Sequence, residues 1–514
     1  MEKNLRKLLI IAFLIGLAII SRFAVEFIYK LIWEYYALSS LLGFSLRFLA
    51  ITLFVLIWLG ITLRSEYPHT KLPWLMLLAL EPIVGLTLFL SFGRSFKQSK
   101  RYKNRPLLQH GQTIKHEAAP GTLNAELKQF SPDIQDLFQT AHKQAHHQPF
   151  INQTDITILQ NGEQFYPDLL ASIKSAKSFI LFEFFIVRDD ETSLKIIDAL
   201  LKKAESGVDV KVIIDALGSA RTSYRLKQKL KKSAVDFIIN DPIFFPLFNT
   251  RINYRNHRKI VVIDGVIGYT GGMNIANEYD NQYNKDFIFR DTQIKCEGQA
   301  VQSLTALFFK DYYYNTNRLI DDLKYYPKTK INSPGVVQIL ESGPDSLQAT
   351  IRDIYVHMIM NAKKSIKIMT PYMAIDQETL TALKFAAKSG VDIQIIVPGK
   401  PDKFLVYKVT KFYITHLIQE GINFYIYNAG FSHAKILIVD DHIASVGSYN
   451  LDNRSAIIDF EVTALFTHKA VLTLLKQFET DKLDSTQVIK ENWLKRSFLM
   501  RLIEGVMSIF TPII

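Results

Sequence analysis

The chain has 514 residues, of which 48% are hydrophobic, and its formal net charge is +12. A chain of this length usually holds two or three domains, and its basic excess favours an anionic partner such as nucleic acid, acidic lipid or phosphate. Its one cysteine, Cys296, excludes an internal disulfide, so nothing in the sequence points to an oxidising compartment.

The first 105 residues are predicted to be a membrane anchor with apolar helices at about 8–29, 40–63 and 72–93. A spanning helix needs ~20 apolar residues. The third run is long enough by itself, and the second is long enough if it extends back past Arg47, whose charged end would reach the membrane surface. Because the loop between these two runs is short, they indicate a transmembrane hairpin, with a buried core hairpin as the alternative. The first run has no small-residue cleavage pattern, so it is predicted to be retained.

Basic residues predict the orientation of this anchor. Six of them follow the third run within residues 94–105, and basic flanks stay in the cytoplasm. The protein is therefore predicted to be a multi-pass protein of the cell membrane with the rest of the chain cytoplasmic. Three spans would place Lys3, Arg6 and Lys7 outside, so either the first segment does not span or the rule is broken there. We favour a long helix lying partly in the membrane interface.

Glu81 interrupts the third run immediately before Pro82. It is interpreted either as a protonated or water-facing carboxyl near a kink, or as a polar contact inside the bilayer.

Residues 106–152 are polar and weakly patterned and are predicted to be a linker. Two similar stretches follow it. The run "ALLKKAESGVDVKVIID" (Ala199–Asp215) is matched by "ALKFAAKSGVDIQIIVP" (Ala382–Pro398), and each predicts a helix, a turn and a buried strand. The sequence therefore predicts an internal duplication of an α/β unit, with domains at 153–330 and 331–490. The two copies are expected to face each other across a pseudo-two-fold axis, each contributing half of one site.

Each copy carries the pattern His, any residue, Lys, four residues, Asp. The members are His257, Lys259 and Asp264 in the first copy, and His433, Lys435 and Asp440 in the second. In both copies the residues after the lysine, "IVVI" and "ILIV", predict a strand, and a G-[GS]-x-N tail ends at Asn274 and at Asn450. One such pattern is weak on its own, but two with matching tails in matching repeats indicate a site.

A phosphate site explains this composition better than a metal site, because a protonated lysine repels a cation. The lysines neutralise phosphate oxygens, and the asparagine amides, Asn274 and Asn450, donate hydrogen bonds to them. One neutral histidine attacks phosphorus to give a phosphohistidine, while the other, protonated, gives its proton to the leaving alcohol. These opposite protonation states explain why two histidines are needed.

Carboxylates complete the predicted site. Asp264 and Asp440 end their strands and are interpreted as anchors of the following turn. Each histidine also needs a carboxylate to fix its tautomer. Glu461 is the candidate in the second half, and Asp291 is the candidate in the first half, with Asp286 as a competitor.

The paired motifs resemble the phospholipase D superfamily and, within it, bacterial cardiolipin synthases. The stretches "LEPIVGLTLFLSFGR", "NHRKIVVIDGVIGYTGGMN", "ESGPDS" and "DDHIASVGSYNLDNRS" are similar to that family from the hairpin to the C-terminus. The chain departs from the family's usual pattern at "FIFRD", Gln293, "FSHAK" and "YMAID", which affects the expected substrate choice more than the chemistry.

This resemblance implies two phospholipase D-like α/β/α sandwich domains preceded by the helical membrane region. It also implies that two phosphatidylglycerols give cardiolipin and glycerol, with the six residues of the paired motifs as the active-site set. The family more often uses its first motif for attack, which predicts His257 as nucleophile and His433 as acid and base. No nucleotide motif is present, and exchange of phosphodiesters is nearly isoenergetic, so no cofactor and no metal are expected.

The final residues, 491–514, are predicted to form an amphipathic helix that either docks on lipid or packs in a core. Two alternative functions remain open. One is another enzyme with the same site, such as a hydrolase, a nuclease or a transferase with another alcohol acceptor; the membrane hairpin argues against nucleic acid. The other is a membrane scaffold with a decayed site.

Overall fold

A computed structural model describes residues 40–63, 68–92, 122–145, 147–242, 254–283, 287–346 and 348–511. The described helices before residue 93 form one compact unit, and the described residues from Thr122 onward form a second. The helix predicted at about 8–29 lies outside the described residues.

The first unit consists of helices α2 (Ser40–Thr62), α3 (Pro68–Leu80) and α4 (Pro82–Phe92). A single helix was predicted at 72–93, but the structure has two, which meet at Glu81. Pro82 has no amide hydrogen to donate and its ring crowds the preceding turn, so a regular helix cannot continue through it. Among the described residues, no helix combines the length and the apolar composition needed to cross a membrane.

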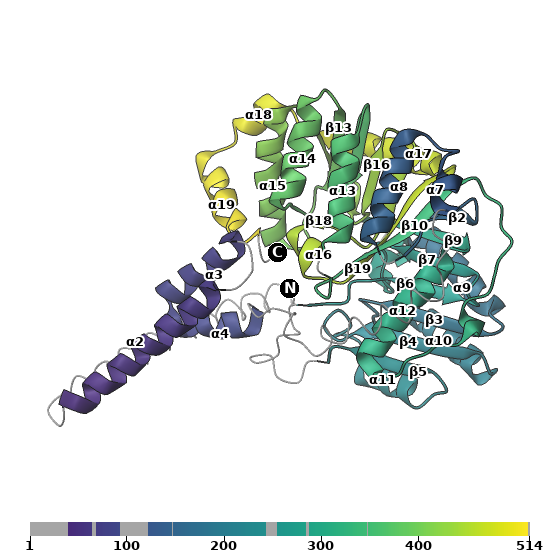
Figure 1. The fold of residues 1–514 in the computed structure, drawn as a ribbon, viewed down its shortest axis with the longest axis horizontal. Helices are drawn as coiled ribbons and strands as arrows, with labels where there is room; N and C mark the ends of the chain where they lie inside the picture. Colours follow the sequence, from purple (N-terminus) through teal and green to yellow (C-terminus); the bar gives the residue numbers. More distant parts are fainter. Residues whose placement is uncertain are drawn as a thin grey trace. The chain divides into compact units, whose positions relative to one another are not determined.

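The second unit contains two large mixed sheets (Figure 1). The seven-stranded sheet has the order β2 (Thr154–Gln160), β9 (Thr292–Gly298), β7 (Ile267–Gly271), β6 (Ile260–Ile263), β3 (Phe179–Phe184), β4 (Asp209–Asp215), β5 (Asp236–Asn240). The nine-stranded sheet has the order β1 (Phe150–Ile151), β10 (Gly335–Ser342), β19 (Glu461–His468), β17 (Ile443–Gly447), β16 (Ile436–Val439), β11 (Ser365–Met369), β13 (Asp392–Pro398), β14 (Asn423–Tyr427), β20 (Ser485–Gln487).

The two sheets repeat one topology. Strands β10 to β14 of the second sheet follow the spatial order and the parallel or antiparallel sense of β2 to β5 in the first. The helices along the chain correspond as well. They are α9 (Asn161–Ser175), α10 (Glu191–Glu205), α11 (Tyr224–Lys231) and α12 (Val301–Thr316) in the first half, and α13 (Thr350–Asn361), α14 (Gln377–Lys388), α15 (Phe404–Leu417) and α17 (Ala470–Leu483) in the second.

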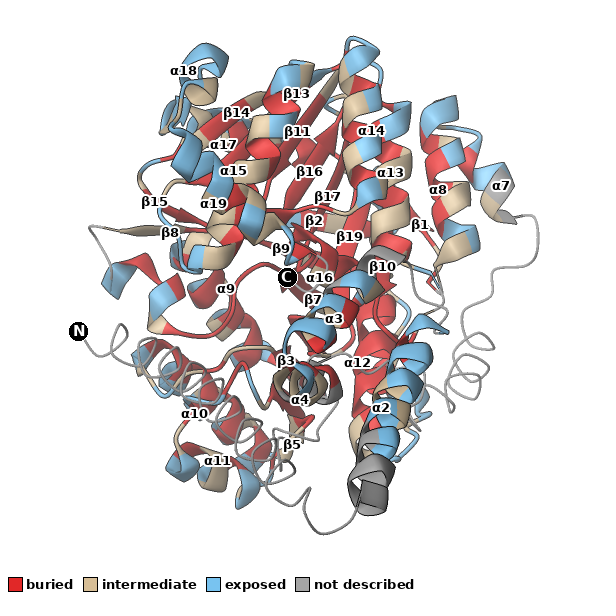
Figure 2. Ribbon diagram, turned by 90° about the vertical axis from the view of Figure 1, so that its left-hand side faces the viewer, coloured by how far each residue is buried: buried red, intermediate tan, exposed pale blue. Residues whose placement is uncertain are grey.

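One hydrophobic core joins the two halves. It contains buried side chains of both sheets together with those of α12 and α17, such as Ile260, Leu304, Ile436 and Leu474. The opposite face of the first sheet is covered by α9, α10 and α11, and that of the second by α13, α14, α15 and α8 (Pro132–Gln144). The strands are therefore buried on both faces (Figure 2), which explains their nearly continuous apolar sequences.

Smaller elements complete the unit. They are helices α7 (Thr122–Leu127), α16 (Asn453–Ile457), α18 (Lys490–Leu494) and α19 (Phe498–Ser508), the 3₁₀ turns η4 (Asn277–Tyr279), η5 (Asn281–Tyr283), η6 (Leu323–Tyr325) and η7 (Ile418–Glu420), and the strand pairs β8 (Ile288–Arg290) with β15 (Gly430–Ser432) and β12 (Met373–Ala374) with β18 (Leu451–Asp452). The helix predicted in the final residues is thus two short helices, α18 and α19.

Candidate active site

Both histidines lie where the two halves meet. His257 precedes β6 and His433 precedes β16, and these strands begin and end where "IVVI" and "ILIV" predicted them. The backbone N–H of His433 donates to the carbonyl of Arg290 (2.7 Å), and that of His257 donates to the carbonyl of Phe460 (2.9 Å). The parallel pairing of β8 with β15 fixes the first of these contacts. Each histidine is therefore fastened to a segment of the opposite half.

The carboxylates that face the histidines are crossed between the halves. His257 Nδ1 lies 3.0 and 3.1 Å from the two carboxylate oxygens of Glu461, and His433 Nδ1 lies 2.7 Å from Asp291 Oδ2. The residues were both predicted, but within their own halves, whereas the structure exchanges them. The competing candidate Asp286 lies outside the described residues. Because an ionised carboxylate only accepts, Nδ1 carries the hydrogen and Nε2 keeps its lone pair.

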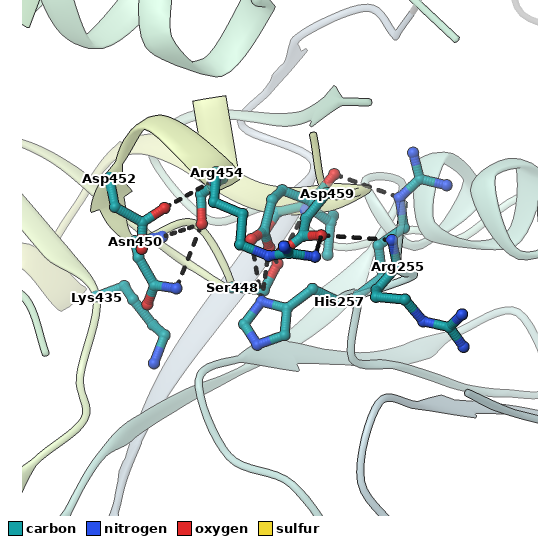
Figure 3. A network of polar contacts seen from close by, with 12 residues as sticks. Arg255, His257, Lys435, Ser448, Asn450, Asp452, Arg454 and Asp459 are labelled. Atoms are coloured by element: carbon teal, nitrogen blue, oxygen red, sulfur yellow. Dashed lines mark hydrogen bonds and ion pairs between the residues drawn. The ribbon is translucent and has the colours of Figure 1, made fainter. Parts of the chain in front are cut away.

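The second position of the G-[GS]-x-N tail, Gly272 in one copy and Ser448 in the other, lies against the carboxylate that contacts the histidine. A Cβ added at Gly272 would lie 2.1 Å from Asp291 Oδ1, so this position leaves no room for a side chain. At the equivalent position Ser448 donates its hydroxyl hydrogen to Glu461 Oε2 (Figure 3). The glycine and serine alternatives of the tail therefore correspond to the two different carboxylates.

The two lysines are buried beside the histidines. Lys259 Nζ donates to the carbonyl of His257 (2.6 Å), and Lys435 Nζ donates to the carbonyl of His433 (2.5 Å). Burial lowers the pKa of Lys259 to about 7 and that of Lys435 to about 8, although Glu461 and Asp291 oppose the change. An arriving phosphate anion would favour the charged form of both groups.

The two histidines respond to the same charges. Burial, first of all, lowers the pKa of both His257 and His433 well below the usual range, and the ammonium groups of Lys259 and Lys435 lower both further. Since each lysine affects both rings, the four side chains form one electrostatic cluster. In the free site both rings are neutral at pH 7 and available as nucleophiles or bases.

The surroundings of the two rings differ. His433 is surrounded by aromatic rings, with centroids between 5.3 and 6.5 Å from its own, which belong to Tyr279, Phe289, Tyr372 and Phe431. Among the described residues, His257 has one such neighbour, Phe185, at 5.0 Å. The duplicated motifs are therefore placed in unequal environments.

Burial also raises the pKa of the partner carboxylates, to about 6 for Asp291 and about 7 for Glu461. The lysines oppose this change in both cases. Asp291 accepts a further hydrogen bond from the backbone N–H of Thr292 (2.7 Å), which favours its ionised form. Asp291 is thus the better anion of the two at pH 7, and it forms the shorter contact with its histidine.

The two asparagines are buried and partly committed to protein groups. Asn274 Oδ1 accepts from the N–H of Ile186 (3.1 Å), and its Nδ2 donates to the hydroxyl of Tyr279 (2.7 Å). Asn450 Nδ2 donates to Ser455 Oγ (3.3 Å). Within the described chain, Asn450 Oδ1 is buried without a hydrogen-bond partner. A direct phosphate contact by either residue stays a prediction.

Asp264 and Asp440 lie at the far ends of β6 and β16 from the histidines. The carboxylate of Asp264 accepts from the backbone N–H groups of residues 177, 178 and 179, and that of Asp440 accepts from residues 363, 364 and 365. Both have a left-handed backbone, with φ of 52° and 49°. We therefore assign them to anchoring the strands, and not to the catalytic set that the family resemblance implied.

A buried network of ion pairs contacts the site through Glu461. The guanidinium of Arg258 is fully buried and donates to Asp311 Oδ2 (2.5 Å), to Glu341 Oε2 (2.9 Å) and to the carbonyl of Glu461 (3.3 Å). It thus holds the backbone of a residue that contacts a histidine. Arg258 occupies the position between His and Lys in the first motif, where the second motif has Ala434. This difference between two otherwise similar motifs is the sequence signal that could have identified Arg258.

A second group flanks Glu461 along the chain. Arg454 donates two hydrogen bonds to Asp459, at 2.9 and 3.0 Å, and Asp459 also accepts from the N–H of Arg255 (Figure 3). Asp452 begins α16 and accepts from the N–H of Ser455 (2.7 Å). Burial raises the pKa of Asp452 to about 7. None of these residues was singled out in the sequence, because each looks like an ordinary polar residue of a loop.

Comparison with known proteins follows the same two halves. The family described as "Cardiolipin synthase, PLD-like domain" matches residues 169–311 and 355–482. A cardiolipin synthase of Halalkalibacterium halodurans is 35% identical over 485 residues, which cover 94% of this chain and 95% of the relative. Cardiolipin synthase 1 of Bacillus anthracis is 36% identical over 468 residues, which cover 88% of this chain and 91% of the relative.

A solved structure gives the same fold at lower identity. The phosphatidylserine synthase of Haemophilus influenzae superposes with a TM-score of 0.57 at 16% identity, and the match covers 73% of this chain and 99% of that one. At this identity the likeness concerns the fold alone.

Proposed function

Because the chain belongs to the cardiolipin synthase family of phospholipase D-like phosphatidyltransferases, we propose that it transfers the phosphatidyl group of one phosphatidylglycerol to another, releasing cardiolipin and glycerol. The observation that carries this proposal is the pairing of two histidines, each held at Nδ1 by a carboxylate of the other half, around two buried lysines. We further propose that residues 153–330 and 331–490 are the two copies of one domain that build this site together.

The reaction has two displacements at phosphorus. Binding of the anionic phosphate favours the imidazolium of His433, which takes up a proton from solvent. In the first displacement, Nε2 of His257 attacks the phosphorus of a phosphatidylglycerol, and the bond to the glycerol oxygen breaks while protonated His433 gives that oxygen its proton. In the second, neutral His433 takes the proton of a hydroxyl on another phosphatidylglycerol, whose oxygen displaces His257. Cardiolipin leaves, and both histidines return to their starting forms.

The unequal partners support this division of roles. The acid must become an imidazolium, and Asp291, the more acidic carboxylate with the shorter contact, is the better counter-ion for it. Glu461 forms the longer contacts, 3.0 and 3.1 Å, and leaves His257 less polarised. A neutral imidazole is what the attack on phosphorus requires.

Positive charge at the phosphate comes from the chain itself in this proposal. Lys259 and Lys435 neutralise the oxygens that gain charge at each displacement, and Asn274 and Asn450 donate amide hydrogens to them. The proposed reaction therefore needs neither a metal nor an organic cofactor.

We also propose that the protein is located in the membrane, because the substrates of the proposed reaction are lipids. Large apolar side chains of α2 and α3 are exposed in the structure, among them Phe48, Ile51, Leu56, Leu72 and Leu80. We propose that they face acyl chains in a membrane hairpin, with the catalytic halves in the cytoplasm. Single cysteines at Gln112 and between residues 64 and 71, in a Cys296→Ser background, test the orientation. An impermeant thiol reagent added to intact cells should label the loop alone, and labelling of position 112 would reverse it.

A product analysis tests the proposed activity. Purified full-length protein is given phosphatidylglycerol vesicles in the presence of a chelator, and lipids are identified by mass spectrometry. Cardiolipin and glycerol should form in equal amounts, and added glycerol should return cardiolipin to phosphatidylglycerol. Phosphatidic acid as the main product would indicate a hydrolase. Products with other alcohols only would indicate a different transphosphatidylase, and no turnover by folded protein would indicate a scaffold.

A further inference from the structure

Helix α19 buries its carboxylate and exposes most of its large apolar side chains, which is unusual for a surface helix. Its one fully buried residue is a carboxylate, Glu504, which is 2% exposed. Five of its large apolar side chains are exposed, from 45% at Val506 to 72% at Phe498, whereas Ile503 and Met507 are half-buried and Met507 packs against the core. The exposed apolar set is Phe498, Leu499, Met500, Leu502 and Val506, continued by Ile509 and Phe510. A contiguous apolar patch on a surface marks an interaction site.

Polar contacts hold this helix with its apolar face outward. Arg496 donates to both oxygens of Glu504, at 2.7 and 3.0 Å, and also to the hydroxyl of Thr415 on α15 (2.8 Å). The guanidinium lies 3.7 Å from the ring centroid of Trp493, whose Nε1 donates to the same hydroxyl (3.0 Å). A two-pronged arginine–carboxylate pair has a defined geometry, so the orientation of α19 is fixed by the fold.

Cations border the apolar face. Helix α19 packs against α15 (Figure 2). Four lysines accompany α15, and each lies over an aromatic ring: Lys400 over Phe287, Lys403 over Tyr372, Lys408 over Phe404, and Lys411 over Tyr407. Lys495 and Arg501 are exposed beside the apolar residues, and Glu504, the only carboxylate of α19, is buried.

This basic edge adjoins the active site. Lys403 Nζ lies 4.6 Å from the ring centroid of Tyr372, which in turn lies 6.5 Å from the ring centroid of His433. Side chains that would meet a surface through α19 and α15 are thus near the groups proposed to act on phosphate.

We propose that α19 and the lysines of α15 form a docking face for the surface of an anionic bilayer. The apolar side chains would enter the boundary between headgroups and acyl chains, while the lysines and arginines would contact lipid phosphates. A bilayer is favoured over a protein partner by the combination of an exposed apolar stripe with a border that carries cations and no exposed carboxylate of α19. Docking through this face would bring the active site close to lipid headgroups. This proposal concerns how the protein binds a membrane and not the reaction that it catalyses.

A depth measurement on the full chain tests this inference. Leu502→Cys is labelled with an environment-sensitive fluorophore in a Cys296→Ala background, and Leu472→Cys, an exposed leucine of α17, is the matched control. The protein is reconstituted in phosphatidylcholine vesicles containing phosphatidic acid, which has no alcohol to release and so separates docking from turnover. Nitroxides are placed on the lipids either near the headgroup or at the chain end.

The probe at position 502 should be quenched severalfold more by the shallow nitroxide than by the deep one, while the probe at 472 stays unquenched. Lys408→Glu with Lys411→Glu should reduce this quenching in phosphatidic acid vesicles severalfold. A water-exposed probe at 502 would overturn the inference. Stronger quenching by the deep nitroxide would also overturn it, because the helix would then be inserted in the bilayer. So would a probe at 502 that reports apolar surroundings but is quenched by neither nitroxide, because protein would then cover the face.

Discussion

The two halves of the active site have nearly the same backbone and different chemical surroundings. In both, a histidine precedes a buried strand, a lysine follows two residues later, and an aspartate at the strand end binds three backbone amides. Yet His433 faces Asp291 within a group of aromatic rings, whereas His257 faces Glu461, which accepts from the hydroxyl of Ser448. The repeated backbone gives the two motifs the same geometry, and the unequal surroundings are the basis on which we propose different roles for the two histidines.

The crossed contacts also explain why the halves cannot act separately. Each histidine takes its carboxylate and a backbone hydrogen bond from the other half. A single copy would hold a histidine without the group that fixes its tautomer. The shared core between the sheets, with α12 and α17, keeps this exchange in register.

The largest effect is expected from neutralising the two carboxylates. Asp291→Asn and Glu461→Gln should each lower cardiolipin formation by roughly 10²–10⁴-fold, because an amide favours the wrong tautomer of its histidine. They should differ with a nitrophenyl leaving group, which departs without a proton. The first turnover should then recover in Asp291→Asn and stay lost in Glu461→Gln. Recovery in the glutamate variant alone would exchange the roles, and Glu479→Gln, an exposed change, serves as control.

A smaller effect is expected at the tail position that differs between the halves. A methyl group at Gly272→Ala would lie 2.1 Å from Asp291 Oδ1, so the carboxylate must move, and displacement on the order of 1 Å costs up to about 10²-fold in rate. Ser448→Ala removes one hydrogen bond from Glu461 without adding an atom, so its loss should be only severalfold. Equal rates for the two variants would show that the halves tolerate the same change. Circular dichroism checks that both are folded.

Much of this site could be predicted from the sequence. The buried strands and the repeat follow from apolar runs and from matching stretches of sequence, and Asp291 and Glu461 were candidates because each histidine needs a carboxylate to fix its tautomer. The exchange of Asp291 and Glu461 does not follow from the sequence, because β8 meets β15 through a pairing between distant segments that no local pattern contains. The break at Pro82 could have been read from the sequence, since proline ends a regular helix. Asp264 was predicted to anchor the turn after its strand, but its carboxylate instead accepts from backbone N–H groups of residues 177–179, a contact between distant segments.

The pH dependence should follow the buried lysines and carboxylates. As pH rises through 7 to 8, Lys259 and then Lys435 lose their protons, so kcat/KM should fall. As pH falls through 7 to 6, Glu461 and then Asp291 gain protons and release their histidines, so it should fall again. Bound phosphate favours ammonium, so kcat should decline at a higher pH than kcat/KM.

Replacement by arginine sharpens this test. Lys259→Arg keeps its charge at every pH measured, so the alkaline decline of the variant should move upward to the pKa of Lys435, about 8, even if its maximal rate is lower. Lys476→Arg, on the surface of α17, is the control and should leave the profile unchanged. A rate that stays flat between pH 7 and 9 in the unaltered enzyme would show that neither lysine titrates there.

The smallest effect concerns a carboxylate that the second half has and the first lacks. Asp452 stands where the first half has Ala276, and burial raises its pKa to about 7. A raised pKa means that the folded state holds the proton more tightly, so stability falls as pH rises from the ordinary aspartate range toward 7. Asp452→Asn keeps the helix cap and removes the charge. Its Tm should rise by a few degrees at pH 8, less at pH 5, and an equal rise at both would contradict this account.

The division of roles between the histidines is tested most directly by trapping the intermediate. A phosphatidyl substrate with a nitrophenol leaving group is given to His433→Ala and to His257→Ala, and nitrophenolate release is followed with peptide mapping. His433→Ala should release one burst and stall with the lipid attached to a peptide containing His257, because no base remains to activate the acceptor. His257→Ala should give neither burst nor adduct. A burst from His257→Ala with the adduct on His433 would exchange the assignments, and no adduct on either would contradict a covalent intermediate.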